Sequence, residues 1–416
     1  MSTLKIKIKQ PFIECLDKFQ NLNPDSNKIL KIQGIKEGLF PEYLDQLIPL
    51  HLNYENPPVG NFFGFLKNSE RLPYKKYFSN LSLAPLFRTK RTIDIVTTFK
   101  GKIAIYKDAY ANQFGEFVIN NYIIRPPYDS SAIYIREFHE GPVVFECDKA
   151  CVFGHIWMYN FGHFIDDCLA PLAIVPEDFL EDCVVILSEL SRKFGEDVLK
   201  AIGVRKYIYL ANNTWVHANK LAVAVEGRPH LMHFGIPIQK LVYMLRIYFK
   251  VSNIKPTKYA IMNRDLKTRR HITNIKELMI AIKSNITGVK FEEIEDKLGT
   301  IESYAKFYPS IKCVLLPTGS NAVKTIFMNP NTVVIIASNE MFDYSVICSI
   351  LSVHVKVVYF FQCQYHFNDI TIDVELAIQA IEVGVYASIH GNFPQPKEFI
   401  SFIDYMPKHR PIYVGD

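Results

Sequence analysis

The chain has 416 residues, of which 49% are hydrophobic and 21% are charged. This composition is typical of a folded globular protein and excludes a largely disordered one, and the length favours two domains over one hydrophobic core. The net charge of +5 suits an anionic ligand but is too small to indicate nucleic-acid binding. We therefore expect a two-domain globular protein without a nucleic-acid partner.

The cysteines and the apolar segments indicate in which cellular compartment the protein is expected. The eight cysteines are scattered, with no Cys-x-x-Cys pair and no zinc-type spacing. The N-terminal residues lack the continuous apolar stretch of a signal peptide, and no apolar run is long enough to span a membrane. These features predict a cytoplasmic location without a membrane span.

Prolines interrupt the first 90 residues, which we expect to form an irregular N-terminal extension (1–90) with short helical pieces. Beyond them, strand-like runs alternate with helical patterns, which predicts a parallel sheet with crossover helices. The expected strands are 93–96, 102–106, 117–119, 143–145, 184–187, 207–210 and 221–225, and the expected helices are 189–201 and 236–250. The segment 91–250 is therefore predicted to be one Rossmann-like domain.

An apolar stretch of this domain carries three polar residues at helical spacing. Asn160, His163 and Asp167 fall on one face of a helix, and His163 and Asp167 are four residues apart, close enough to touch. The adjacent Asp166 points about 100° away. The pattern is compatible with proton transfer, with a metal site that includes His155, or with a buried histidine that serves only the fold.

The alternation becomes more regular after Lys255-Pro256-Thr257, which is typical of a connection between domains. The expected strands are 259–262, 289–294, 313–316, 332–337 and 355–361, and the expected helices are 272–283, 301–307, 321–328, 342–351, 374–381 and 396–403. This pattern predicts a doubly wound α/β domain (251–390), then a C-terminal helix and tail (391–416) that can pack back on the N-terminal domain. We expect two α/β halves that face a cleft, with ligands at the carboxyl ends of the strands.

Basic residues follow the first strand of this second domain. Arg264, Arg269 and Arg270 lie between that strand and a helix that opens near Asn274. Guanidinium groups at the carboxyl end of a strand, beside a helix N-terminus, suit a phosphate group. A solvated basic loop or a nucleic-acid patch would have the same composition.

A turn of small residues follows the strand 313–316. Thr318, Gly319, Ser320 and Asn321 lead into a helix that contains Lys324. A strand, a small-residue turn and a helix start make a candidate phosphate cradle, although the segment matches neither the GxGxxG nor the P-loop pattern. The arginine-rich loop and this turn both follow strands of one predicted sheet, and together they are stronger evidence for a phosphate site than either is alone.

These segments resemble glycosyltransferase family 61, which includes EGF-domain O-linked N-acetylglucosamine transferase and plant xylan xylosyltransferases. Asn160, His163 and Asp167 match its N-x-x-H-x-x-x-D/E segment position for position. The arginine-rich segment up to Asn274 resembles a second family segment. Residues 317–332 resemble a third, H-G-A-G-L-x-N-x-x-F-M-x-P-G-T. The order and spacing agree over roughly residues 153–381.

The resemblance implies a GT-B fold, two Rossmann-like halves of which the C-terminal one binds the nucleotide sugar. It further implies an inverting transferase that moves N-acetylglucosamine or a pentose such as xylose from a UDP-sugar to a hydroxyl of a glycan or glycoprotein. No cofactor or metal is implied. Asp167 is expected to be the base, aided by His163 and Asn160. The expected donor-binding residues are Arg264, Arg269, Arg270, Asn274, Thr318, Gly319, Ser320, Asn321 and Lys324.

The third segment departs from the family pattern in three places. Thr318 replaces the family histidine, Asn321 the second glycine and Lys324 a later asparagine. These changes leave a second hypothesis open, a non-catalytic binding or scaffold protein on a degenerate transferase fold. A third hypothesis is a metal-dependent hydrolase that uses His155, His163 and the neighbouring aspartates.

Overall fold

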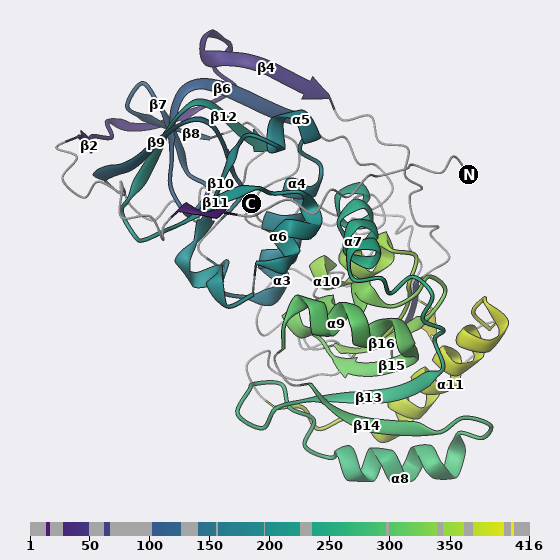
Figure 1. The fold of residues 1–416 in the computed structure, drawn as a ribbon. Coiled ribbons are helices and arrows are strands. Elements are labelled where there is room, and N and C mark those ends of the chain that lie inside the picture. The colour runs from purple at the N-terminus through teal and green to yellow at the C-terminus, as the bar shows by residue number, and fades with distance from the viewer. Residues whose placement is uncertain are drawn as a thin grey trace. The chain divides into compact units, whose positions relative to one another are not determined.

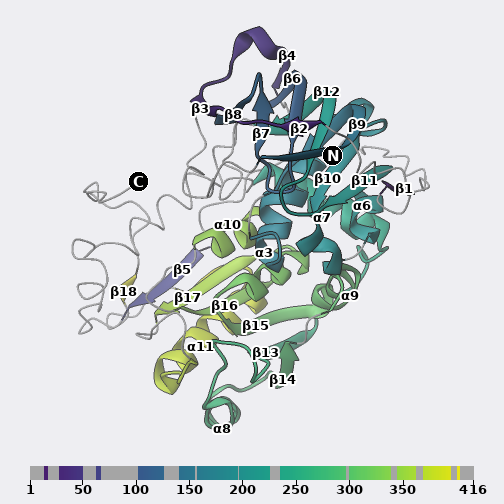
Figure 2. The same ribbon diagram turned by 90° about the vertical axis from the view of Figure 1, so that its left-hand side faces the viewer.

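The computed structural model describes residues 14–16, 28–49, 62–66, 102–125, 140–154, 157–194, 196–224, 235–296, 299–338, 344–361, 369–394 and 401–402. The chain divides into two compact units. The first comprises residues 1–54 and 100–249, and the second comprises residues 55–99 and 250–416. Figures 1 and 2 show the ribbon of both units in two views. The strand expected at 93–96 lies outside the described residues.

The first unit is built on a mixed sheet. Its strands are β1 (Glu14–Cys15), β2 (Ile29–Leu30), β3 (Gly34–Glu37), β4 (Leu44–Pro49), β6 (Lys102–Ala111), β7 (Phe117–Ile119), β8 (Tyr122–Arg125), β9 (Gly141–Val152), β10 (Val184–Ser188), β11 (Lys206–Leu210) and β12 (Trp215–Ala224). They run in the order β1-β11-β10-β9-β12-β6-β7-β8-β3, with β2 beside β9 and β4 beside β6. Strands β11, β10, β9 and β12 are parallel to one another, as expected, whereas the pairs β12–β6, β6–β7 and β7–β8 are antiparallel.

The antiparallel half corrects the prediction of a doubly wound first domain. Asn120 and Asn121 join β7 to β8 with φ angles of 47° and 64°. Two consecutive left-handed residues make the tight hairpin turn that matches the twist of antiparallel strands, and asparagine tolerates this conformation. The chain therefore returns directly along its neighbour, without a crossover helix.

The N-terminal region also differs from the irregular extension with helical pieces that we expected. Among the described residues, β3 pairs with β8 and β4 pairs with β6, so both are part of the first sheet. The strand β5 (Phe62–Leu66) belongs instead to the second sheet, beside β17. These short segments form strands because they pair with strands far away in the sequence, and local periodicity does not predict this.

The helices of the first unit are short apart from α7 (Ile236–Tyr248). The others are η2 (Pro41–Tyr43), α3 (Phe161–His163), a π-helix (Phe164–Leu169), α4 (Ala170–Ala173), α5 (Glu177–Leu180), η6 (Glu189–Phe194) and α6 (Asp197–Ile202). The single helix expected at 189–201 is wrong, because it is divided into η6 and α6. The Ser188 hydroxyl accepts from the backbone N–H of Leu190, and such side-chain bonds compete with a continuous helix.

The second unit contains a nearly all-parallel sheet. Its strands are β13 (Lys258–Arg264), β14 (Phe291–Asp296), β15 (Ile311–Pro317), β16 (Val333–Ser338), β17 (Lys356–Phe361), β5 and β18 (Ser401–Phe402), in the order β14-β13-β15-β16-β17-β5-β18. Among the strands in the described residues of this sheet, β18 alone is antiparallel, to β5. The first five strands thus follow the doubly wound order 2-1-3-4-5, whose winding reverses between β13 and β15.

Helices cover both faces of this sheet. They are α8 (Ile275–Asn285), α9 (Ile301–Phe307), η7 (Tyr308–Ser310), η8 (Ser320–Phe327), α10 (Tyr344–Ser352) and α11 (Val374–His390). In both views α8 and α11 lie on one side of the strands and α9 and α10 on the other. Apolar residues of the strands, such as Ile261, Leu315 and Ile335, are fully buried between these layers. The helix expected at 396–403 is wrong at its described residues, since Ser401–Phe402 is strand β18.

Candidate functional site

The predicted contact between His163 and Asp167 is present in the first unit. Nδ1 of His163 lies 2.8 Å from Oδ2 of Asp167. An ionised carboxylate only accepts hydrogen bonds, so beside one the imidazole donates through Nδ1, and Nε2 is the nitrogen that can take up a proton. The Asp167 side chain is 1% exposed and that of His163 is 25% exposed. The histidine is therefore the member of the pair that solvent or a substrate can reach.

The pair lies where the helix changes its winding. α3 ends at His163, and the next six residues, including both aspartates, form the π-helix. π-Helical turns are rare and are frequent at functional sites. Phe194 stacks on Phe164 with ring centroids 4.8 Å apart and meets Phe161 edge-on, which fixes this segment against η6.

The residues around His163 and Asp167 do not follow the single helical face that the sequence predicted. Asn160 is the residue before the first turn of α3, and it has an extended backbone and a half-buried side chain. Trp157 packs against the ring of His163, with centroids 5.3 Å apart. Asp166 is buried, 5% exposed, and is not the surface carboxylate that an outward-facing helix position would give.

The metal hypothesis depends on His155, which lies outside the described residues. Within the ranges that the structure describes, no group of three or more His, Cys, Asp or Glu side chains is arranged to hold a metal ion.

In the second unit, the loop after β13 is closed by hydrogen bonds to its own strand. Asn263, 3% exposed, donates through Nδ2 to the carbonyl of Ile272 and accepts through Oδ1 from the N–H of Ile272. His271 Nδ1 donates to the carbonyl of Arg264, and Arg264 Nη1 donates to the carbonyl of Arg269. The loop therefore brings the arginines back to the carboxyl end of β13.

The structure brings the arginine loop and the small-residue turn together. A Cβ built on Gly319 would lie 2.5 Å from Nη1 and 2.7 Å from Cζ of Arg270, so the guanidinium rests directly on this glycine. Gly319 has φ 128° and ψ −178°, a conformation that only glycine adopts readily. Arg270 itself has φ 68°. Two unusual backbone conformations thus meet where the winding of the sheet reverses, the usual place for a ligand in such folds.

The predicted donor-binding residues are not all equally accessible. Thr318 is 2% exposed, and its N–H donates to the carbonyl of Ala337 in the neighbouring strand. Ser320 and Asn321 are half-buried, and Arg269 is exposed. The side-chain amide of Asn274 donates to the carbonyl of Ile372 and accepts from its N–H, which ties the start of α8 to the segment before α11.

Lys324 has a partner that the sequence did not indicate. Its Nζ lies 2.6 Å from Oδ1 of Asp296, and the two side chains are 0% and 9% exposed. The same ammonium lies 4.5 Å from the ring centroid of Tyr304. Lys324 is therefore enclosed by the fold, and its charge is balanced by a carboxylate.

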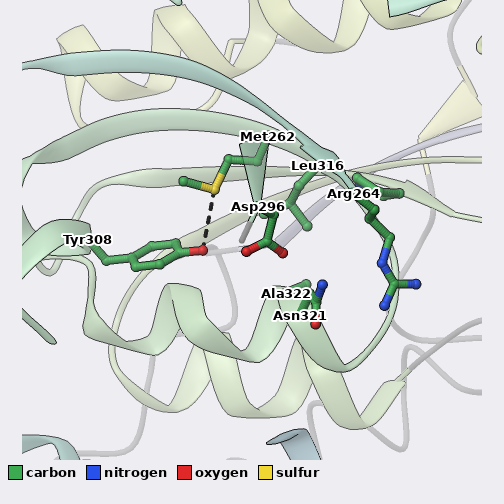
Figure 3. A pocket seen from close by; sticks show the side chains of 8 residues that line it. Met262, Arg264, Asp296, Tyr308, Leu316, Asn321 and Ala322 are labelled. Atoms are coloured by element: carbon green, nitrogen blue, oxygen red, sulfur yellow. Dashed lines mark hydrogen bonds between the residues drawn. The ribbon is translucent and has the colours of Figure 1, made fainter. Parts of the chain in front are cut away.

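A small pocket opens at these strand ends (Figure 3). The residues that line it include Met262, Arg264, Asp296, Tyr308, Leu316 and Asn321. The space among these side chains is about 210 Å³ with open solvent included, so a whole nucleotide sugar does not fit inside it. Tyr308 donates its hydroxyl to the sulfur of Met262, and burial, with the nearby Asp296 charge, raises the Tyr308 pKa well above its usual value. The phenol is therefore a neutral hydrogen-bond donor.

Asp296, Tyr308 and Asn263 were not among the predicted site residues. A signal for Asp296 was available, because it ends the strand next to β13 and the carboxyl ends of parallel strands share one edge. Nothing in local spacing indicated Tyr308 or its hydrogen bond, which joins residues 46 positions apart.

Comparison with known proteins gives one family. Residues 161–335 match the family model Glycosyltransferase 61, and no curated protein matches the chain. Among the described residues, no helix is both long and apolar enough to cross a membrane. The matched region begins just before His163 and includes Arg264, Arg270 and Gly319. The resemblance that the motifs indicated is confirmed over residues 161–335, which match the family model.

Proposed function

We propose that this protein is an inverting glycosyltransferase of GT-B type that uses a UDP-sugar donor. N-acetylglucosamine or a pentose such as xylose is transferred to a hydroxyl of a glycan or glycoprotein. The observation that carries the proposal is the contact of Arg270 with Gly319 at the reversal point between β13 and β15, inside the family-matched region.

The second unit supplies the donor site in this proposal. Arg264 and Arg270 offer planar guanidinium groups that hydrogen-bond two phosphate oxygens at once. The absence of a side chain at Gly319 lets the Arg270 guanidinium lie against the backbone at this turn. Positive charge held at this point stabilises the diphosphate as it leaves, so the arginines can serve where other transferases use a metal.

The first unit supplies the base. The acceptor hydroxyl gives its proton to Nε2 of His163 while its oxygen bonds to the anomeric carbon of the donor. The bond from that carbon to the diphosphate oxygen breaks on the opposite face, and the electron pair leaves with the UDP. Asp167 holds the ring through Nδ1 and stabilises the imidazolium that forms. The sequence assigned the proton to Asp167, but its 1% exposure favours the half-buried histidine as the group that meets the acceptor.

The first experiment is a thermal-shift screen with nucleotide sugars, since a ligand that binds only the folded state raises the unfolding temperature. The proposal expects stabilisation by UDP and by at least one UDP-sugar, and loss of both in Arg270→Ala. Release of UDP in the presence of acceptor glycans then tests transfer. Stabilisation by no nucleotide would refute the proposal.

The alternative function is binding without catalysis on a degenerate transferase fold. The replacement of the family histidine by Thr318 favours it, because the side chain of Thr318 is almost entirely buried. It expects nucleotide binding without UDP release, and binding that is unchanged in His163→Gln.

A further inference from the structure

Asp296 lines the small pocket, and its carboxylate forms an ion pair with Lys324 behind it. Both side chains are at least nine-tenths buried, and their charged atoms are 2.6 Å apart. Removing two charges from water costs free energy that can exceed their attraction, and an apolar pair of similar size is often no worse for stability. The pair therefore points to a use for the carboxylate in the pocket.

The carboxylate lies next to the donor site. Asp296 and Arg264 are directly paired residues at the ends of β14 and β13, and both line the pocket. Figure 3 shows the carboxylate of Asp296 turned into this space, between the hydroxyl of Tyr308 and the amide of Asn321. Lys324 engages Oδ1. A carboxylate has about four acceptor sites, so it still has capacity for a ligand that donates hydrogen bonds.

The charged side chains at these strand ends suit two different parts of a ligand. A phosphate suits Arg264 and Arg270 but is repelled by Asp296. The group next to the phosphates must instead be neutral and carry hydrogen-bond donors. In a nucleoside diphosphate that group is the ribose, whose two neighbouring hydroxyls match the two oxygens of a carboxylate. An acidic residue after the second strand meets a ribose in the same way in other doubly wound sheets.

We propose that Asp296 binds the ribose hydroxyls of the donor nucleotide and that Lys324 is the positioning residue that holds this carboxylate. The inference rests on the proposed function, because it takes the ligand to be a nucleotide sugar. It makes the protein selective for ribonucleotides over 2′-deoxyribonucleotides.

Calorimetric titration with UDP and 2′-deoxy-UDP tests this selectivity, with GDP and 2′-deoxy-GDP as a second pair. A hydrogen bond to a charged group implies that the 2′-deoxynucleotide binds about 10- to 150-fold more weakly to the wild-type protein. In Asp296→Asn the ribonucleotide should weaken toward the affinity of its 2′-deoxy form, so that the ratio of the two dissociation constants falls toward one.

Two further variants keep the test valid if Asp296→Asn folds poorly. The double variant Asp296→Asn with Lys324→Met removes both buried charges and should fold, yet it should also lose the selectivity. Lys324→Arg keeps a cation for Asp296 and should retain selectivity. Glu293→Gln is the matched control, because it removes an exposed carboxylate from the same strand, and its ratio should equal that of the wild-type protein.

The outcomes separate the two proposals. Equal affinity of the wild-type protein for UDP and 2′-deoxy-UDP overturns the role of Asp296 and leaves the glycosyltransferase proposal intact. Selectivity that persists in the double variant does the same. Binding of none of the four nucleotides to the wild-type protein overturns both proposals.

Discussion

Replacement of Gly319 by alanine tests how the arginine loop and the small-residue turn act together. The new Cβ would lie 2.5 Å from Nη1 of Arg270, about 1 Å closer than a normal non-bonded contact. The guanidinium is the movable partner, so it should leave the strand ends. The backbone at φ 128° adds a strain of about 1–3 kcal/mol, because a residue with a Cβ avoids this region.

The expected losses follow from these two effects. Removal of one charge-assisted hydrogen bond weakens UDP binding by about 1.5–3 kcal/mol, or roughly 10- to 150-fold in the dissociation constant. The backbone strain lowers the free energy of unfolding by about 1–3 kcal/mol. Calorimetric titration with UDP measures the first loss, and denaturant unfolding measures the second.

A matched control separates strain from the arginine contact. Gly391 also has a positive φ, 79°, but a Cβ there would meet nothing within 4 Å. Gly391→Ala should therefore lose stability by about 1 kcal/mol and bind UDP normally.

A double-mutant cycle gives the sharper test of the contact. If Gly319 acts through Arg270, adding Gly319→Ala to Arg270→Ala should cost no further affinity. Wild-type affinity in Gly319→Ala would refute the reasoning, and so would full additivity of the two substitutions.

Three other substitutions have definite expected results. Asp167→Asn should reduce UDP-sugar turnover by about 10³- to 10⁴-fold with UDP affinity unchanged, because His163 loses the group that orients it. Turnover is measured by steady-state kinetics and UDP affinity by titration. Normal turnover would contradict the role of Asp167. Lys324→Met should cost about 3–5 kcal/mol of unfolding free energy by leaving the Asp296 carboxylate buried without its cation. Adding Asp296→Asn should recover most of that loss in denaturant unfolding, and a fully stable single variant would show that the pair is not needed. Burial raises the pKa of Tyr106 to about 12, above about 10 for an unfolded tyrosine, so stability should be full below pH 10 and fall by roughly 2–3 kcal/mol toward pH 12. Tyr106→Phe should lose less stability over that range, and an equal loss in both proteins would refute the assignment.

The sequence predicted local features of the second unit well. Helix α9 was expected at its observed bounds, and β13, β15, β16 and β17 within a few residues, because continuous apolar runs bounded by polar turns are characteristic of buried parallel strands. The contact of His163 with Asp167 was equally accessible, since residues four apart meet on any helical turn.

Features that depend on distant pairing were not accessible. The strand β5 lies beside β17, nearly 300 positions away, and no local pattern encodes such a partner. Arg270 meets Gly319, and Lys324 meets Asp296, only because the order of the strands brings their carboxyl ends to one edge of the sheet. The sequence also does not show that the Lys324 side chain is buried, and Lys324 was therefore expected to contact the diphosphate.

One error had a local signal that was available. Asn120-Asn121 between two apolar runs is typical of a tight hairpin, and it indicated antiparallel strands in the first sheet. The alternation of strands and helices further along the chain favoured a fully parallel sheet instead. The observed sheet combines both patterns.

The most direct test of the central claim is UDP release from a panel of UDP-sugars with glycan acceptors, by the wild-type protein and by Asp167→Asn and Arg270→Ala. The account predicts acceptor-dependent release of UDP by the wild-type protein from at least one donor. Asp167→Asn should bind UDP normally but should not cleave the UDP-sugar, whereas Arg270→Ala should not bind UDP. UDP release by Asp167→Asn at the wild-type rate, or no UDP binding by the wild-type protein, would contradict it.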